Sequence, residues 1–305
     1  MTTHSKETYT LPELTKLIAS LLNRPAASIS DVAPMKFGMT NKSWTFRHDG
    51  ETCIIRIPGL GTDKLIDRRQ ECKVYETIRP FAISDTVLYF GEDSGIKISR
   101  FIDGARNCNP KNADDVAACI RRLRELHQMR LDVPYEFNLR ERIFYYEQLR
   151  GNVPSVYPDY DQTRGKMEKL LDYVDSLEKD HVLCHIDSVA DNLLISERNG
   201  KKNILLIDWE YAAMQDPHID LAMFVVYSGL SRAEADHIVD IYCDGVCPAA
   251  IRQKFYAYIA LCGFLWSNWC EFKAIRGEDF GDYATMQYGY AKDYYRIFRE
   301  ETAKN

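Results

Sequence analysis

The sequence predicts an α+β protein with two lobes: a small N-terminal lobe built on an antiparallel sheet over residues 1–102, and a larger, mainly helical lobe over residues 103–305. Short runs of β-forming residues separated by turns fill residues 35–101, whereas helical spacing of apolar residues dominates from residue 113 onward. The chain has 305 residues and is 46% hydrophobic, so it can bury a core in each of two lobes.

The N-terminal lobe is expected to alternate helices with strands. Pro12 and Glu13 suit the first turn of an amphipathic helix, and Pro80 ends a second helical pattern. The β-like runs lie between them and after them. In order, the expected elements are a helix at 11–22, two strands within 35–48 around a turn at 38–41, a strand at 51–57, a helix at 63–78, and strands at 86–91 and 95–101.

The second lobe is expected to follow the turn at Asp103-Gly104 and to hold a β-hairpin among its helices. One predicted helix carries four side chains along one side, namely Val116, Ile120, Leu123 and His127. The other expected elements are a helix at 166–177, a hairpin of strands 192–196 and 203–208 around the turn at 199–200, and an aromatic-rich helical region from 220 onward.

Composition excludes or disfavours several classes of protein. The net charge is −6 and the charges are interleaved, which disfavours a nucleic-acid partner. The cysteines number nine, and none has partners at zinc-site spacing, so reduced thiols are expected. The first ten residues lack a signal-peptide pattern, and the longest apolar run, 255–266, is too short to span a bilayer. We therefore expect a cytoplasmic protein without a membrane partner; the oligomeric state is left open.

Two segments, 185–192 and 207–210, hold the residue types that phosphoryl transfer requires. Such a reaction needs a group that orients and deprotonates the attacking hydroxyl, and oxygen ligands that hold Mg²⁺ against the phosphates of ATP. Asp187 suits the first task because a loop carboxylate can reach a hydroxyl proton. Asn192 follows at kinase spacing, and Asp208 ends a predicted buried strand. Each residue alone is typical of an ordinary turn, but the ordered combination around a hairpin predicts a kinase.

The same segments resemble the H-x-D-x-x-x-x-N loop and the D-x-E motif of the aminoglycoside phosphotransferase and choline kinase superfamily, whereas a protein kinase would show H-R-D and D-F-G. The resemblance covers nearly the whole chain and implies a protein-kinase-like fold. It further implies that Asp187 is the catalytic base, that Asn192 and Asp208 bind Mg²⁺, and that Glu210 is a further metal-site residue. Two residues are expected to support the shape of the loop, His185 and Asp220.

The nucleotide phosphates are expected to meet the loop at 37–43. Its single glycine, Gly38, makes an ordinary hairpin the alternative, but Gly38, Thr40 and Asn41 resemble the G-x-T-N loop of bacterial choline kinases. Arg56 stands where many kinases place a phosphate-contacting lysine, and Glu71 is its expected partner, because an arginine–carboxylate fork can hold a strand against a helix.

Other positions remain open for the nucleotide. Three basic residues are alternatives to Arg56 at the phosphates, although they could equally be solvated helix residues: Lys64, Arg68 and Arg69. The stretch at 97–102 is expected to connect the lobes, with its backbone at Arg100, Phe101 and Ile102 meeting the adenine of ATP.

Trp266 and Trp269 suggest which alcohol is phosphorylated. Residues three apart share one helix face, which is typical of core packing, but an aromatic box is also the direct way to bind a quaternary ammonium, which donates no conventional hydrogen bonds. Further walls are expected from Tyr211, Tyr227 and Tyr283. Either Glu210 or Asp216 could add negative potential.

Choline kinases carry a similar W-x-x-W helix followed by an aromatic, glycine-containing segment like 280–283. The motifs at 98–105 and 206–212 also resemble bacterial choline kinases of the surface-glycan phosphocholine pathway. The expected reaction is the ATP-dependent phosphorylation of choline. Ethanolamine, thiamine or an aminoglycoside are alternative acceptors of the same fold, and a catalytically silent nucleotide-binding module is the alternative from another class.

Overall fold

The computed structural model describes residues 9–35, 41–59, 62, 65–198 and 200–303. They form two compact units. The first comprises the described residues of 1–106 together with 196–210, and the second comprises 107–195 together with the described residues of 211–305. Residues 196–210, expected in the second lobe, group with the first unit. Within the described residues, no helix is long and apolar enough to cross a membrane.

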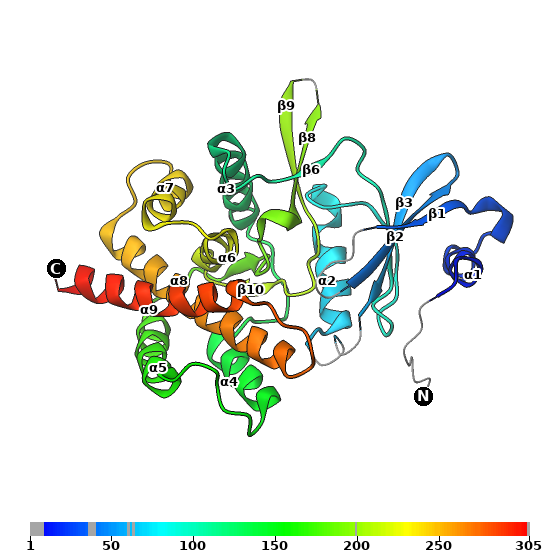
Figure 1. Ribbon diagram of the computed structural model, residues 1–305. Coiled ribbons are helices and arrows are strands. Elements are labelled where there is room, and N and C mark those ends of the chain that lie inside the picture. The colour runs from blue at the N-terminus through cyan, green and yellow to red at the C-terminus, as the bar shows by residue number, and fades with distance from the viewer. Residues whose placement is uncertain (1–8, 36–40, 60–61, 63–64, 199, 304–305) are drawn as a thin grey trace. The chain divides into compact units, whose positions relative to one another are not determined.

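The first unit is built on a five-stranded antiparallel sheet with the order β1-β2-β3-β5-β4 (Figure 1). Its strands are β1 (Ser30–Pro34), β2 (Asn41–His48), β3 (Glu51–Pro58), β4 (Val87–Phe90) and β5 (Lys97–Arg100). The turn between β2 and β3 places Asp49 at φ 50° and Gly50 at φ 78°, the left-handed pair that a tight hairpin requires. The hairpin fixes the register that sets Ser43 opposite Arg56.

Of the two strands predicted within 35–48, the second is β2, whereas residues 36–40, on which the first falls, lie outside the described residues. The strand β1 was not predicted; its residues are mostly exposed and its register shifts between Ser30 and Ala33. An edge strand with a bulge and a terminal proline has no apolar alternation, so its sequence gives no strand signal. The predicted turn at 38–41 lies outside the described residues except for Asn41.

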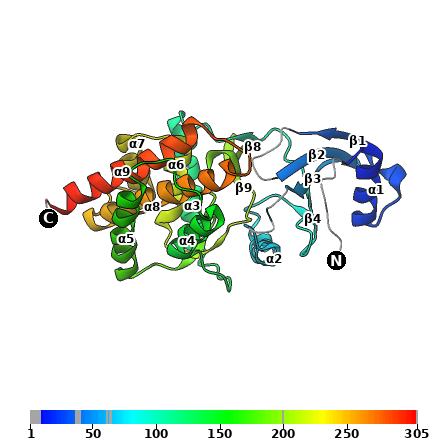
Figure 2. The same cartoon turned by 60° about the horizontal axis from the view of Figure 1, so that its bottom comes forward.

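Two helices cover opposite sides of this sheet (Figures 1 and 2). The helix α1 (Leu11–Leu22) has the predicted bounds and buries Leu14 and Ile18 against the sheet residues Phe46 and Ile55. The other helix, α2 (Arg68–Ile78), begins five residues later than predicted. The Asp67 carboxylate caps it by accepting the N–H groups of residues 69 and 70 at 3.0 and 3.3 Å.

The second unit is mainly helical. Its helices are α3 (Ala113–Gln128), α4 (Leu139–Arg150), α5 (Tyr160–Ser176), α6 (His218–Ser228), α7 (Arg232–Cys243), α8 (Ala249–Ala274) and α9 (Asp282–Thr302). The apolar side predicted for α3 is confirmed, since all four of its named side chains are buried. The helix α5 begins six residues before the predicted residue 166. The prediction began too late because a glycine usually marks a helix boundary, whereas Gly165 lies inside this helix.

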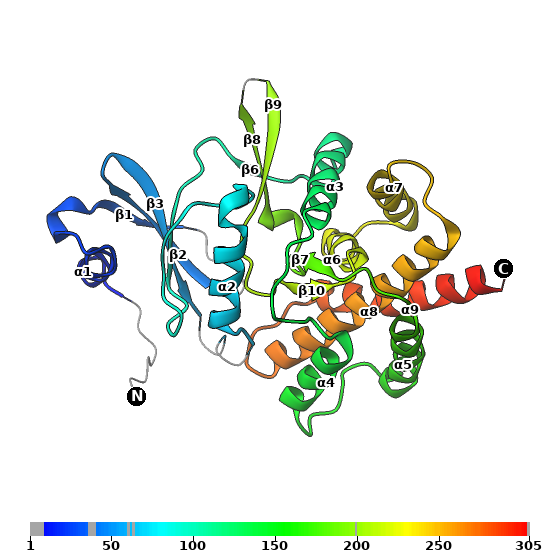
Figure 3. The same cartoon turned by 180° about the vertical axis from the view of Figure 1, so that it is seen from behind.

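The helix α8 is the centre of this unit. It is buried from Phe255 to Lys273 and runs beside α9, as Figures 1 and 3 show. Gly263 permits this close approach, because a Cβ atom at that position would lie 2.7 Å from both the Gln287 carbonyl oxygen and the Tyr290 Cβ. The backbone of α9 thus occupies the space that a side chain would fill.

Short strands position the loop of interest. In the second unit, β7 (Val182–Cys184) pairs with β10 (Ala213–Gln215) in antiparallel register. The loop at 185–192 follows β7 and leads into β8 (Leu193–Arg198), which pairs with β9 (Lys201–Leu206) and with the two-residue strand β6 (Arg106–Asn107). Within the first unit, the Leu206 N–H donates to the Ile83 carbonyl at 2.9 Å and anchors the end of β9.

Candidate active site

The loop at 185–192 has a constrained backbone. Ile186 adopts φ 67°, a left-handed conformation that is costly for a β-branched residue, and the Asp187 N–H donates to the His185 carbonyl at 2.8 Å. The carboxylate of Asp220, in the first turn of α6, accepts the N–H groups of His185 and Ile186 at 2.9 and 2.7 Å. The bracing contact expected of Asp220 is therefore present, and it holds the strained turn in place.

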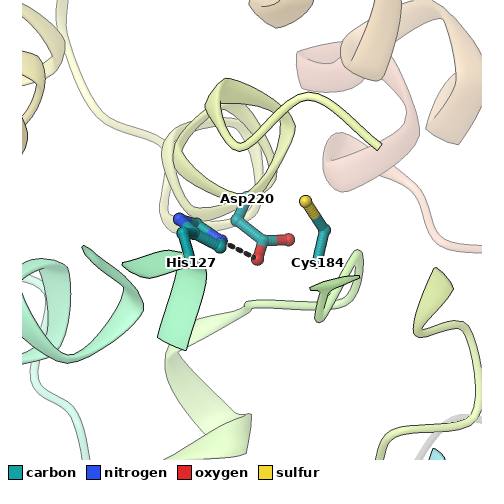
Figure 4. A group of neighbouring side chains, drawn as sticks. All are labelled: His127, Cys184 and Asp220. Carbon is teal, nitrogen blue, oxygen red and sulfur yellow. Dashed lines mark hydrogen bonds and ion pairs between the residues drawn. The ribbon is translucent and has the colours of Figure 1, made fainter. Parts of the chain in front are cut away.

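Asp220 also contacts His127 of α3, whose Nε2 lies 2.9 Å from the carboxylate (Figure 4). Cys184 lies beside this pair, and its thiol donates to the Gln215 carbonyl at 3.4 Å. Burial and the negative charges of Asp220 and Asp216 raise the pKa of Cys184 well above its usual value. The ligand atoms of His127, Cys184 and Asp220 lie within 4.8 Å of one another, and all three side chains are buried.

His127 was predicted only as part of an apolar helix face. A histidine at an apolar position is usually a packing residue, and nothing in the sequence linked His127 to Asp220, which lies 93 positions away. Its other nitrogen, Nδ1, lies 2.9 Å from the Tyr242 hydroxyl, which fixes the ring. His185, fully buried in the loop, likewise contributes to the shape of the loop.

Asp187 and Asn192 face each other across the loop. The Asn192 side-chain amide donates to the Asp187 carboxylate and to the Asp187 carbonyl oxygen, both at 2.9 Å. Asp187 is half-buried, so its carboxylate retains access to solvent while the amide fixes its orientation. This pairing gives the loop a carboxylate in a defined position, which is what a general base requires.

The first unit carries a buried cluster of charges. Arg56 of β3 donates to Glu71 of α2 and to Asp208, each at 2.5 Å, which confirms the predicted pairing of Arg56 with Glu71. Arg68, one turn before Glu71, donates to Glu71 at 2.7 Å and to Glu210 at 3.0 Å. The guanidinium groups of Arg56 and Arg68 thereby join β3, α2 and the segment after β9.

The position of Arg68 depends on a glycine. Gly95 has φ 66°, and a Cβ atom there would lie 2.5 Å from the Arg68 Nε. The Glu210 carboxylate also accepts a hydrogen bond from the Asn41 amide at 3.2 Å. Arg68 was expected either to contact a phosphate or to be a solvated helix residue. It is in fact only 8% exposed, and it is paired with two carboxylates.

Three carboxylates in this cluster, Glu71, Asp208 and Glu210, have oxygen atoms within 4.8 Å of one another. Oxygen donors of this kind suit Mg²⁺. Burial and the charge of Asp208 raise the pKa of Glu210 to about 7, although Arg56 opposes the shift. A divalent cation would relieve this repulsion between carboxylates, so the donor set fits the predicted metal. Asn192 belongs to the second unit, and its role as a ligand stays a prediction.

The predicted nucleotide residues have mixed outcomes. Gly38, Thr40 and Lys64 lie outside the described residues. Arg69 is 74% exposed and pairs with Asp93, as a solvated helix residue would. Of the connector, Arg100 is exposed, Ile102 is half-buried, and the Phe101 N–H donates to the Thr52 carbonyl at 2.9 Å within the sheet. The adenine contact of this stretch stays a prediction.

The five residues predicted to bind the alcohol substrate lie together in the second unit: Tyr211, Tyr227, Trp266, Trp269 and Tyr283. Each ring lies close to the next, with centroid separations of 6.3 Å from Tyr211 to Trp266, 5.5 Å from Trp266 to Trp269, 4.8 Å from Trp269 to Phe280, 6.5 Å from Phe280 to Tyr283 and 6.1 Å from Tyr283 to Tyr227. We call these six residues the aromatic series. Phe280 is the member that links the tryptophans of α8 to the tyrosines.

The aromatic series ends beside the loop at 185–192. The Tyr227 hydroxyl donates to the Asp191 carboxylate at 2.6 Å, and the Asn107 amide holds the same carboxylate at 3.1 Å. Burial and the Asp191 hydrogen bond raise the pKa of Tyr227, and the negative charge of Asp187 adds to the shift. The pKa of Tyr283 is also raised, mainly by burial and in part by Asp187. The field of Asp187 therefore reaches both tyrosines.

Asp216 and Glu210, the two possible sources of negative potential, each have ionic partners of their own. Asp216 is fully buried and binds His218 at 2.6 Å and Lys254 at 2.7 Å, so its charge is neutralised by its own neighbours. Glu210 lies in the charge cluster of the first unit. Asp191 was not predicted, because an aspartate in a turn is ordinary and only its contact with Tyr227 distinguishes it.

An antiparallel sheet with a buried arginine–carboxylate cluster, joined in one chain to helices that carry an Asp–Asn loop, defines a small-molecule kinase of protein-kinase-like fold. The chain belongs to the choline/ethanolamine kinase family, whose family model matches residues 32–261.

Individual relatives agree with this family. The curated protein named Protein LicA of Haemophilus influenzae is 24% identical over 257 residues, which cover 81% of this chain and 94% of the relative. The crystal structure of choline kinase LicA from Streptococcus pneumoniae superposes with a TM-score of 0.80 at 27% identity, covering 93% of this chain and 98% of that one. The aminoglycoside phosphotransferase APH(4)-Ia shares the fold, with a TM-score of 0.66 at 14% identity over 93% and 98% of the two chains.

Proposed function

We propose that this protein is a choline kinase, which transfers the γ-phosphoryl group of ATP to the choline hydroxyl and yields phosphocholine and ADP. The observation that carries the proposal is the aromatic series, which runs from Tyr211 through the tryptophans of α8 to Tyr227, whose hydroxyl contacts Asp191 of the loop at 185–192. The similarity to a choline kinase of known structure, also solved in complex with AMP, supports the same substrates.

The aromatic series suits a quaternary ammonium. Such a group is a large, weakly hydrated cation without N–H donors, and each aromatic face that it touches contributes on the order of 0.5–2 kcal/mol. Trp266, Trp269, Tyr211, Tyr227 and Tyr283 are the proposed walls. A primary ammonium such as that of ethanolamine would need several hydrogen-bond acceptors, and rings supply few.

Asp187 is the proposed general base. As the choline oxygen forms a bond to the γ-phosphorus and the bond from that phosphorus to the ADP oxygen breaks, the hydroxyl proton passes to the Asp187 carboxylate. Asn192 orients this carboxylate through the bond at 2.9 Å. His185 and Asp220 act on the loop and do not touch the reacting atoms, because they are buried behind it.

The nucleotide and its metal are proposed to engage the charge cluster. Asp208 and Glu210, with Asn192, would hold Mg²⁺, which when bound neutralises charge on the phosphates. Arg56, fixed by Glu71, is the proposed phosphate contact. The segment around Gly38, Thr40 and Asn41 and the connector at 100–102 complete the proposed ATP site.

An ADP-release assay across candidate acceptors tests the substrate. Purified protein with ATP and Mg²⁺ is given choline, ethanolamine, thiamine and kanamycin separately, and kcat/KM is compared. We expect choline to be the best acceptor by at least about tenfold, the discrimination that about 1.4 kcal/mol of extra binding gives. Better turnover of any other acceptor would refute the choice of choline while leaving the kinase assignment intact.

Replacing Asp187 by Asn tests the base. Because the amide keeps the shape but cannot accept the proton, we expect kcat to fall by about 10²–10⁴, with an unchanged thermal unfolding midpoint. The control is Asp161→Asn, an exposed position in the first turn of α5, which should leave kcat unaltered. Near-normal turnover by Asp187→Asn would assign proton removal to another group.

A further inference from the structure

Lys273, near the end of α8, places an ammonium of the chain itself against the aromatic series. Its side chain is 6% exposed, and its Nζ lies 5.6 Å from the centre of the Trp269 ring. The same Nζ donates to both carboxylate oxygens of Glu278, at 2.9 and 3.0 Å. A buried ammonium is costly unless it is paired, so Glu278 is what permits Lys273 to occupy this position.

The pair closes the turn between α8 and α9. The Glu278 N–H donates to the Lys273 carbonyl at 3.1 Å, and the Gly277 N–H donates to the Ala274 carbonyl at 2.9 Å. Gly277 adopts φ 91°, which allows the chain to fold back at once after the helix. Two residues after Glu278, Phe280 covers Trp269 at 4.8 Å. The ion pair and the aromatic series are therefore parts of one local structure.

Charge makes this arrangement significant for the acceptor. Trp269 is one ring of a series proposed to receive a cation, yet its neighbour is already a cation. Two like charges several ångströms apart in a partly buried setting repel by an amount large enough to alter affinity severalfold. Glu278, whose side chain is 48% exposed, supplies the compensating charge and brings the net charge of the pair to zero.

We propose that Glu278 is a specificity-determining residue for cationic acceptors: by neutralising Lys273 it prevents the ammonium of the chain from opposing the ammonium of the substrate. This inference rests on the proposed function, since it concerns how the aromatic series accepts choline. Glu278 acts through Lys273 and does not touch the reacting atoms, so it is a positioning residue of the acceptor site and has no catalytic role.

The test compares Lys273→Met, Glu278→Gln and the double variant. Glu278→Gln leaves the ammonium uncompensated, so we expect the KM for choline to rise on the order of tenfold, while the KM for ATP stays within about twofold. Lys273→Met removes the opposing cation, so the choline KM should stay near or below that of the wild type. The double variant should behave like Lys273→Met, because without the ammonium Glu278 has nothing to neutralise.

A neutral isostere of choline, 3,3-dimethylbutan-1-ol, separates charge from packing. It has the same shape without the positive charge, so its inhibition constant should be the same in the wild type and in Glu278→Gln. Arg296→Met and Glu300→Gln, at an exposed pair on α9, are the matched controls and should leave both constants unaltered.

Two results would show that the ion pair acts through packing: an equal increase in the choline KM of both single variants, or a higher inhibition constant of the neutral isostere for Glu278→Gln. Either result would overturn this inference and leave the proposed function intact. The wild type is assayed first by choline turnover and by the change in tryptophan fluorescence on adding choline. If the wild type shows neither turnover of choline nor a fluorescence change, both the proposed function and this inference are refuted. That outcome differs from a packing role, in which the wild type still turns over choline.

Discussion

Arg68 and Arg69 are adjacent in the chain, yet they occupy opposite environments. Arg68 is 8% exposed and pairs with Glu71 and Glu210, whereas the Arg69 side chain is 74% exposed and pairs with Asp93 at 3.4 Å. Breaking a buried pair leaves charges without compensation in a poorly solvated place, while an exposed pair is replaced by water. The two arginines thus form a natural comparison within one helical turn.

We expect Arg68→Met to lower the free energy of unfolding by about 3 kcal/mol or more, because it leaves the buried carboxylates of Glu71 and Glu210 with one partner fewer. Arg69→Met should alter it by less than about 0.5 kcal/mol. Urea unfolding followed by fluorescence measures both. Similar values for the two variants would mean that the charge cluster contributes no net stability beyond that of a surface pair.

Where α8 and α9 cross, the size of a side chain, and not its charge, determines which residue the position tolerates. Gly263 has no room for a side chain, whereas a Cβ atom at Gly165 in α5 would meet no heavy atom within 4 Å. Both residues lie inside helices, where alanine is intrinsically favoured over glycine by about 1 kcal/mol. The same substitution at the two positions therefore separates helix propensity from packing.

We predict that Gly165→Ala raises the free energy of unfolding by up to about 1 kcal/mol. Gly263→Ala should lower it by about 1–3 kcal/mol, the usual cost of overpacking, because α9 must move away from α8. Chemical denaturation of each variant gives the two values. A stabilised Gly263→Ala protein would show that the two helices separate readily.

The start of α6 is tied to α8 through Asp216. Although burial alone would raise the pKa of Asp216, the hydrogen bond and charge of His218 and the charge of Lys254 lower it to about 2, from an ordinary value of 3.8. The folded state therefore prefers the ionised form. The stability that this preference contributes is present above pH 3.8 and is lost as the pH falls toward 2.

A shift of this size corresponds to about 2 kcal/mol at neutral pH. We expect Asp216→Asn to be less stable than the wild type by about that amount at pH 7, with the difference shrinking as the pH is lowered from 4 to 3. Urea unfolding at a series of pH values measures it, with the exposed Asp161→Asn as the control. A difference that does not depend on pH would indicate lost packing instead of lost charge.

For the whole molecule, binding of the acceptor should appear as added stability. A ligand that binds only the folded protein at 100 times its Kd adds about 2.7 kcal/mol to the free energy of unfolding. We therefore expect choline to raise the thermal midpoint in a concentration-dependent manner, and 3,3-dimethylbutan-1-ol to raise it much less at equal concentration. Equal stabilisation by the two compounds would show that the aromatic series does not select for charge.

Much of the architecture could be predicted from local patterns. The bounds of α1, the hairpin of β2 and β3 and the buried side of α3 depend on neighbours in the chain, so turn signals and apolar spacing reveal them. The strand β1 and the start of α5 could not be found in this way. The first is an exposed, bulged edge and the second contains a glycine, and neither leaves a periodic signal.

Candidate site residues could be predicted where the residue type and its spacing along the chain together indicate a chemical role. Arg56 and Glu71 were expected to interact, and they are in contact. Asp187 and Asn192 were expected in one loop with separate roles, and the structure adds a contact between their side chains. The contributions of Arg68, His127 and Lys273 were not predicted, because arginine, histidine and lysine on helices are usually solvated or packed. Only three-dimensional contacts reveal their partners: Arg68 and His127 contact carboxylates far away in the sequence, and Lys273 contacts Glu278 across the turn after α8.

The carboxylate of Asp220 holds the loop at 185–192 through two main-chain N–H groups, those of His185 and Ile186. A carboxylate that holds the backbone does not depend on which side chains that backbone carries. Changes in the side chains at positions 185 and 186 would therefore leave this contact in place, whereas loss of the carboxylate on α6 would release both N–H groups at once.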